Sequence, residues 1–211
     1  MEPTQNVNPS REDIDAFRQQ PDDDAIIMVN LLRFNGEEGR KRYGEYAKVS
    51  GQEIAELGGR VIYSARNAVG PGVPWDSVAL VYYPRREAWL SMQDSPAYQA
   101  AIEDRTAGLS ARLLYAFRSP TGVQSFDDIP SNNNTEIAVV NLLRYNGDEG
   151  KAEYQQYGRV ASGLINETGG EVLLHLEADY PLVSDYEWQN LILLRYPSLE
   201  ALMTMVQGET W

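Results

Sequence analysis

An asparagine interrupts each of two apolar runs in the chain. Asn30 lies within the run Ala25–Phe34, and Asn141 lies in a second run of nearly the same sequence. A buried amide is costly unless its donor and acceptor are both hydrogen-bonded. Either the amide lines a pocket and binds a small polar ligand, or it fixes the end of a strand or loop. Repetition does not distinguish these hypotheses, because a duplication copies both kinds of residue.

Arg33 and Arg144 stand at the ends of the same two runs. A guanidinium group there could bind a carboxylate through two parallel hydrogen bonds. The alternative is a surface ion pair with the acidic residues that follow, at 37–38 and 148–149. In so acidic a chain, the surface pair is the favoured hypothesis.

Aromatic residues form a third candidate set. Tyrosines recur about one turn apart on one face of two expected helices, and a tryptophan opens the third expected strand of each half. A phenol in an apolar pocket can orient a substrate or act as an acid, although such a stripe is more often core. The tryptophans could form a pocket wall or fill the end of a barrel. The residues are Tyr43, Tyr46, Tyr154, Tyr157, Trp75 and Trp188.

His175 is the only histidine, and Ser64 aligns with it in the first half of the chain. It could be a general base of the second half alone, but a structural histidine is the favoured interpretation. A lone histidine is a poor metal ligand, and the chain has no cysteine. Neither a glycine-rich phosphate loop nor a serine elbow occurs. We therefore expect no metal and no cofactor.

The elements that must position these residues are duplicated. Residues 29–39 read VNLLRFNGEEG and residues 140–150 read VNLLRYNGDEG, with nine of eleven positions identical. Equivalent residues of the two copies lie 111 positions apart and, after a two-residue insertion in the second copy, 113 positions apart. Such a match indicates a tandem repeat of one domain.

Each repeat predicts the order strand, helix, strand, strand, helix, and the first repeat continues with a fourth strand. In the first repeat, Gly58 is expected to end the first helix in the left-handed conformation, and Pro84 suits the first turn of the second helix. Ser95-Pro96 should kink or restart that helix. This order is the split βαβ pattern of ferredoxin-like α+β folds. The strands are expected at 25–34, 60–68, 75–83 and 109–117, and the helices at 38–57 and 85–105.

The repeat predicts four segments along the chain. Residues 1–24 are an N-terminal extension with a short helix, for which Ser10 and Asp13 resemble a capping box. Residues 25–118 form the first repeat and residues 119–135 the linker. The second repeat, 136–211, stops where the first has Tyr98, so its last strand is absent. We expect the natural protein to continue beyond Trp211.

Several motifs together resemble the family known as domain of unknown function 1330, in two tandem copies. They are MVNLLRF at 28–34, Gly58-Gly59, Tyr83-Pro84 followed by Glu87-Ala88, and SPAYQ at 95–99. The resemblance implies ferredoxin-like domains whose sheets pair as a dimeric α/β barrel, here within one chain, with a pocket. The superfamily includes cofactor-free oxygenases, isomerases and dismutating haem enzymes, but no chemistry transfers to this chain by motif.

The amino-acid composition limits the kinds of molecule that the protein is expected to bind. With 18 basic and 31 acidic residues, the net charge of −13 disfavours nucleic acid and anionic lipid. No apolar run is long enough for a membrane span and no secretory signal is visible, so we expect a cytoplasmic protein. The two repeats of one chain would form a pseudo-dimer, and the sequence does not decide whether the chain also associates with further copies of itself.

Two hypotheses for function remain. The first is a small-molecule-binding protein with a pocket near Asn30, Tyr43, Tyr46 and Trp75, which could act as a cofactor-free enzyme on a small organic acid or aromatic compound. The second is a non-catalytic binding or assembly module whose repeated residues determine the fold.

Overall fold

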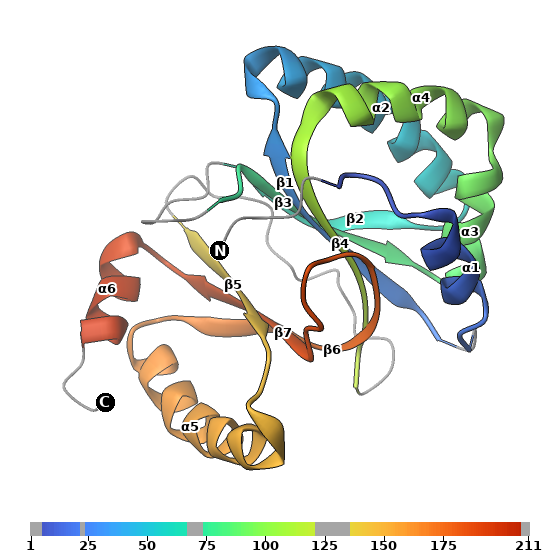
Figure 1. Ribbon diagram of the computed structural model, residues 1–211. Coiled ribbons are helices and arrows are strands. Elements are labelled where there is room, and N and C mark those ends of the chain that lie inside the picture. The colour runs from blue at the N-terminus through green and yellow to red at the C-terminus, as the bar shows by residue number, and fades with distance from the viewer. Residues whose placement is uncertain (1–5, 22–23, 67–73, 121–135, 208–211) are drawn as a thin grey trace. The chain divides into compact units, whose positions relative to one another are not determined.

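The computed structural model describes residues 6–21, 24–66, 74–120 and 136–207 (Figure 1). The chain forms two compact units. The first contains residues 1–128 together with 179–187, and the second contains residues 129–178 and 188–211.

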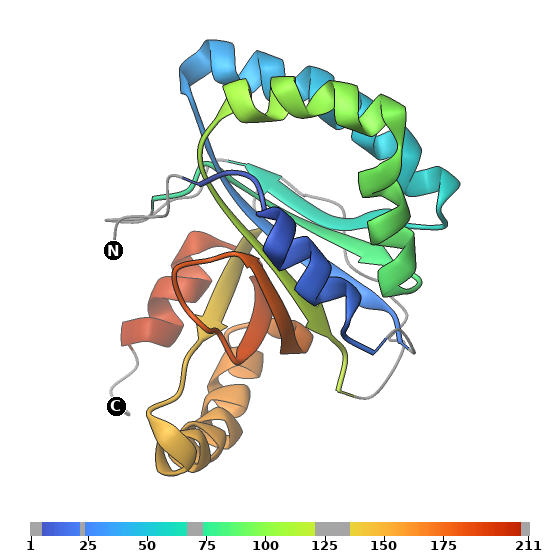
Figure 2. The same ribbon diagram turned by 45° about the vertical axis from the view of Figure 1, so that its right-hand side comes forward.

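The first unit is a four-stranded antiparallel sheet in the order β2-β3-β1-β4. Its helices α2 and α4 lie side by side over one face of the sheet (Figure 2). This order of strands and helices is that of a ferredoxin-like α+β fold. The elements are α1 Arg11–Arg18, β1 Ile26–Phe34, α2 Gly36–Glu56, β2 Arg60–Arg66, β3 Ser77–Tyr83, α3 Arg86–Asp94, α4 Pro96–Gly108 and β4 Leu109–Arg118.

The second unit has its elements in the same order as the start of the first, with strand order β6-β7-β5. They are β5 Ile137–Leu143, α5 Gly147–Glu167, β6 Glu171–Val183, β7 Asn190–Tyr196 and α6 Leu199–Gln207. Within the described residues, no strand follows α6. The two asparagines occupy equivalent places, since Asn30 pairs with Ala79 on β3 and Asn141 with Ile192 on β7.

The ends of the elements follow local chemistry. The expected capping box is confirmed, because the Ser10 hydroxyl accepts from the Asp13 N–H and the Asp13 carboxylate accepts from the Ser10 N–H. Gly58 has φ +75°, which confirms the left-handed stop. Helix α2 begins two residues earlier than expected, because Gly36 turns the chain with φ +67°.

The second helix expected in the first repeat is divided into two helices, α3 and α4. Ser95 ends α3 in an extended conformation and its hydroxyl accepts from the Tyr98 N–H, so the restart predicted at Ser95-Pro96 is confirmed. Pro84 was expected in the first turn but lies before the helix, because Arg85 is the extended N-cap. The expected strand end at 67–68 and most of the expected linker, 121–135, lie outside the described residues.

The segment 179–187, here called the β6 extension, belongs to the first unit although its sequence falls in the second repeat. Leu182 and Val183 are buried in the first unit's core, and the Tyr180 ring lies 5.5 Å from that of Phe17. The guanidinium of Arg86, whose side chain is 1% exposed, donates to both carboxylate oxygens of Asp179, at 2.9 and 3.3 Å. The extension is therefore held by both apolar packing and a buried ion pair.

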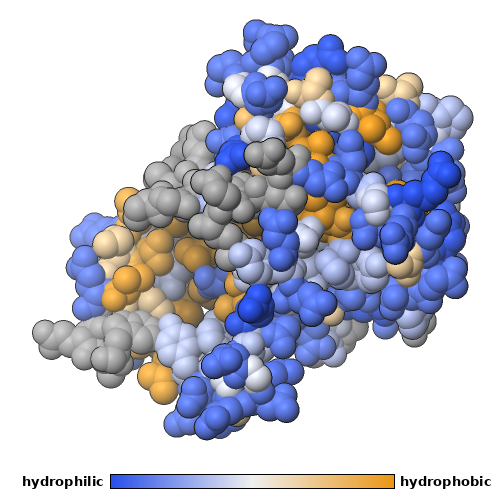
Figure 3. Space-filling model, in the orientation of Figure 1, coloured by the Kyte–Doolittle hydropathy of each residue, from blue (hydrophilic) through white to orange (hydrophobic). Residues whose placement is uncertain are grey.

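Hydrophilic residues predominate on the face drawn in Figure 3, with hydrophobic residues gathered in smaller patches. None of the described helices combines the length and apolar character needed to cross a bilayer.

Candidate functional site

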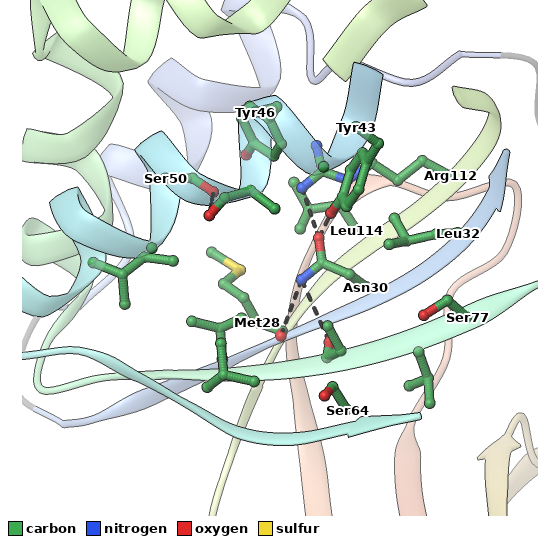
Figure 4. Close-up of a pocket in the computed structure, with 18 of the residues that line it drawn as sticks. Met28, Asn30, Leu32, Tyr43, Tyr46, Ser50, Ser64, Ser77, Arg112 and Leu114 are labelled. Carbon is green, nitrogen blue, oxygen red and sulfur yellow. Dashed lines mark hydrogen bonds between the residues drawn. The ribbon is translucent and has the colours of Figure 1, made fainter. Parts of the chain in front are cut away.

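A cavity of about 470 Å³ lies in the first unit, between α2 and the sheet (Figure 4). That volume is typical of a site for a small organic molecule. Most of its wall is apolar, and a smaller number of polar groups come from α2, α4 and all four strands of the sheet. The apolar wall includes Met28, Leu32, Ile54, Val81, Trp89, Met92 and Leu114.

The charged side chains in the described wall of the cavity are all cations, Arg40, Lys41, Arg66 and Arg112. Arg40 and Lys41 form ion pairs with Glu37 and Glu38, which do not line the cavity. The chain as a whole carries 31 acidic against 18 basic residues. A cavity with one sign of charge and apolar walls focuses the electrostatic field and attracts ions of the opposite sign.

Arg112 is the buried cation of this set, with only 4% of the residue exposed. The Asn30 side-chain oxygen accepts from its Nε at 3.2 Å and its Nη2 at 2.6 Å. Its Nη1 donates to the Val7 carbonyl oxygen at 3.4 Å. Among the residues that the structure describes, no carboxylate forms an ion pair with Arg112.

A guanidinium group has five N–H donors, and these three hydrogen bonds use one on each nitrogen. One N–H is left on each of Nη1 and Nη2, the two nitrogens that can bind a carboxylate as an end-on fork. Arg112 is therefore oriented by the protein while keeping the donors that an anion needs.

Asn30 orients Arg112 from the neighbouring strand. Its Nδ2 donates to the carbonyl oxygens of Met28, at 3.3 Å, and Ala79, at 3.5 Å (Figure 4). The residue is 6% exposed and lines the cavity. Both ends of the amide are thus hydrogen-bonded, which makes Asn30 a positioning residue for the guanidinium.

Tyrosines line the part of the cavity that faces the helices. The ring centroids of Tyr43 and Tyr46 are 5.3 Å apart, and those of Tyr46 and Tyr98 are 5.8 Å apart. The Tyr46 and Tyr98 hydroxyls are hydrogen-bonded at 3.1 Å. Arg105 Nη1 donates to the Tyr98 hydroxyl at 2.6 Å and to the Tyr46 hydroxyl at 3.4 Å.

Burial and charge separate the pKa values of these phenols. Burial raises the pKa of Tyr46, but the charges of Arg105 and Arg112 and the hydrogen bonds with Tyr98 and Arg105 lower it by more, so that the pKa lies below its ordinary value. Burial and the neighbouring Tyr46 raise the pKa of Tyr98 to about 12. Burial likewise raises the pKa of Tyr43 well above the usual range. Tyr46 is therefore the first of these three phenols to ionise as the pH rises.

The structure brings together three of the first-repeat candidates. Asn30, Tyr43 and Tyr46 line the cavity, whereas Arg33 and Trp75 do not. Arg33 is half-buried and its Nε donates to the Ser110 hydroxyl at 3.1 Å.

The second-repeat candidates lie in the other unit and do not line this cavity. Tyr154 and Tyr157 form a ring pair 5.5 Å apart, like the equivalent pair in the first unit. His175 is exposed, and its Nε2 lies 3.1 Å from the side-chain nitrogen of Asn190. Asn141 and Trp188 are half-buried and Arg144 is exposed. In the described residues, no group of three or more His, Asp or Glu side chains could hold a metal ion.

Sequence reasoning missed Arg112, Arg105 and Tyr98. A usable signal existed for Arg112, because it interrupts the apolar run 109–117 as Asn30 interrupts its own run. Arg105 and Tyr98 carry no such signal, since an arginine and a tyrosine on a helix are ordinary surface or core residues.

The order of strands and helices in the first unit defines the ferredoxin-like class of α+β proteins. Residues 37–117, within the first repeat, match the family model described as domain of unknown function (DUF1330). This is the family that the sequence motifs predicted for the first repeat, and the second copy of the domain stays a prediction. No curated protein matches the chain.

Several solved structures are similar in fold. A protein of unknown function from Rhodopseudomonas palustris is 27% identical, with a TM-score of 0.49 over 54% of this chain and 95% of its own. A candidate monooxygenase from Fusobacterium nucleatum is 10% identical, with a TM-score of 0.51 over 88% of this chain and 81% of its own. A candidate monooxygenase from Lactobacillus acidophilus is 13% identical, with a TM-score of 0.48 over 89% and 83%. At 10% identity, the Fusobacterium nucleatum protein indicates similarity of fold alone.

Proposed function

We propose that the first repeat binds a small organic anion with an apolar or aromatic body in the cavity between α2 and the sheet. The observation that carries the proposal is Arg112, a guanidinium in the cavity wall that is only 4% exposed and forms no ion pair with a described carboxylate. Arg112 is the expected anchor of the anionic group.

The energetics of Arg112 support an anion at this position. A buried charge without a counter-ion is costly, because the protein interior solvates it poorly. Asn30 and the Val7 carbonyl supply dipoles, but no described carboxylate supplies a negative charge. A carboxylate on the end-on fork would provide that charge and two charge-assisted hydrogen bonds.

The apolar wall defines the rest of the ligand. Met28, Leu32 and Leu114 project from the sheet, and Ile54 faces them from α2. Such a surface gains free energy by burying apolar carbon. A carboxylic acid with an aromatic or branched aliphatic body therefore fits better than a highly polar anion, which would lose its hydration without replacement.

A second candidate function follows from the bonds of Asn30. Its amide is fully hydrogen-bonded, to Arg112 on β4 and to carbonyl oxygens on β1 and β3. The same residues could act only as a polar tie between three strands, in a non-catalytic module. In that case Arg112 would contribute to stability and to no ligand.

Isothermal titration with benzoate and with benzamide distinguishes the two functions, since the ligands share a shape and differ in charge. We expect benzoate to bind, and benzamide to bind at least about tenfold more weakly. Arg112→Met should weaken benzoate by a similar factor, whereas the control Arg33→Met, on β1 outside the cavity wall, should change it by less than about twofold.

Equal binding of the two ligands, or unchanged benzoate affinity in a folded Arg112→Met variant, would refute the anion site. Thermal melts of each variant show whether it is folded. Arg112→Lys is the second variant. It keeps the charge without the fork and should bind benzoate with an affinity between those of wild type and Arg112→Met.

A further inference from the structure

A second buried arginine lies behind the tyrosines of the cavity. Arg105 is 2% exposed. Its Nε and Nη2 donate to the Asn8 side-chain oxygen, at 3.1 and 2.9 Å, and its Nη1 donates to the hydroxyls of Tyr98 and Tyr46. Within the described part of the chain, no carboxylate pairs with it.

The groups around Arg105 limit what can neutralise its charge. The Asn8 amide cannot ionise, so the two phenols are the groups in contact with the guanidinium that can become negative. A phenolate on Tyr46 would accept hydrogen bonds from Tyr98 and Arg105 at once. The geometry is thus that of an ion pair whose acidic member is a tyrosine.

We propose that Tyr46 is a catalytic residue of the cavity, whose phenolate accepts a proton from a carbon next to a carbonyl group of the bound organic acid. The inference rests on the proposed function, since the acid must first bind at Arg112. Tyr98 and Arg105 are positioning residues, which hold the Tyr46 oxygen and its charge.

Every ionisable group that faces Tyr46 supports this assignment. Arg105 on α4 and Arg112 on β4 lower its pKa, which lies below that of an ordinary tyrosine although burial opposes this. Tyr98 on α4, Tyr43 on α2 and Tyr83 on β3 have raised pKa values and stay protonated where Tyr46 ionises. The proton is therefore lost from Tyr46 first, and from its partner only at higher pH.

The proton transfer needs no other reactant. The C–H bond of the acid breaks, an O–H bond forms on Tyr46, and the C–H electron pair forms a C=C bond as the carbonyl electrons move to oxygen. Arg112 would stabilise the resulting enolate, as buried donors stabilise developing negative charge in other active sites. Return of the proton to the same or a conjugated carbon regenerates the phenolate. The class of reaction is enolisation or isomerisation of an organic acid.

Phenylpyruvate is a suitable probe, because its C3–H bonds lie next to a ketone beside a carboxylate. Deuterium exchange at C3 in D2O is followed by proton NMR, and binding is measured separately by calorimetry. We expect wild type to accelerate exchange, and Tyr46→Phe to lose at least about 100-fold of that acceleration while its affinity changes by less than about threefold. Tyr157→Phe, at the equivalent position of the second repeat, is the matched control and should exchange like wild type.

Binding without accelerated exchange, or equal exchange in Tyr46→Phe, would overturn the role of Tyr46 and leave the anion site intact. Failure of both phenylpyruvate and benzoate to bind would overturn the proposed function and this inference with it.

A near-ultraviolet absorbance titration gives an independent readout without any ligand. It should show one tyrosine that ionises below the ordinary pKa of about 10, and this step should be missing from Tyr46→Phe and present in Tyr157→Phe. A titration without that step would also overturn the inference.

Discussion

Replacing Asn30 by aspartate would give Arg112 a permanent counter-ion without changing the size of the side chain. The oxygen that now accepts from Arg112 Nε and Nη2, at 3.2 and 2.6 Å, would be kept and would carry negative charge. We expect this substitution to weaken the binding of an external anion, because the charge that attracts the anion is already neutralised.

The magnitude follows from Coulomb's law. A ligand carboxylate on the end-on fork of Arg112 would lie roughly 6 Å from the introduced carboxylate. At an effective dielectric constant of about 20, the repulsion is about 3 kcal/mol, which corresponds to roughly 100-fold in affinity. The introduced carboxylate must be ionised for this repulsion to act, and the adjacent guanidinium favours its ionised form.

Calorimetric titration with benzoate measures this loss, and Asn141→Asp is the matched control at the equivalent position of the second repeat. The aspartate would also replace the amide donor that faces Met28 O and Ala79 O, so thermal melts are needed to show that the variant is folded. Unchanged benzoate affinity in folded Asn30→Asp would refute Arg112 as the anchor of the anion.

Three further predictions concern stability. Asp179→Asn should lower the free energy of unfolding by about 3 kcal/mol, because Arg86 would keep a buried charge without its partner; urea denaturation with no loss would contradict the buried ion pair. Gly108→Ala should lower the free energy of unfolding by about 2 kcal/mol, since a Cβ there would lie 2.8 Å from the backbone of α2. The control Gly51→Ala should not lower it, since a Cβ at position 51 would meet no atom within 4 Å. The burial that raises the pKa of Tyr98 to about 12 stabilises the fold below pH 10, and this contribution should be lost as the pH rises towards 12. Urea midpoints that stay constant over this range would refute it.

The fold was predictable because its signals are local. Continuous apolar runs marked β1 and β4, and helical spacing marked α2. Ser95-Pro96 marked the break between α3 and α4, since the proline fits the first turn of a helix better than its interior. These patterns act within a few residues, and the tertiary structure left them unchanged.

The site was predictable only in part, because its polar contacts join distant residues. Asn30 and Tyr46 were found as polar groups in apolar surroundings, but their partners depend on how strands and helices meet. Arg112 reaches Asn30 because Leu32 and Arg112 are paired across β1 and β4. Arg105 reaches Tyr46 because α2 and α4 pack closely, where Gly39 and Gly108 leave no room for a side chain. No local pattern shows either fact.

The β6 extension was missed for a related reason. The two-residue insertion before Trp188 was visible in the alignment of the repeats. That residues 179–187 join the first unit depends on Arg86, Phe17 and the apolar core that receives them. The alternation of apolar and polar residues along a strand does not show against which sheet or core the strand will pack.

The central claim is that an organic anion binds Arg112 in the cavity of the first repeat. A crystal structure of the protein grown with benzoate tests it most directly. We predict the carboxylate oxygens within hydrogen-bond distance of Arg112 Nη1 and Nη2, and the ring against Met28 and Leu114. Benzoate bound elsewhere, or a cavity filled by water at a benzoate concentration that saturates binding in solution, would contradict the claim.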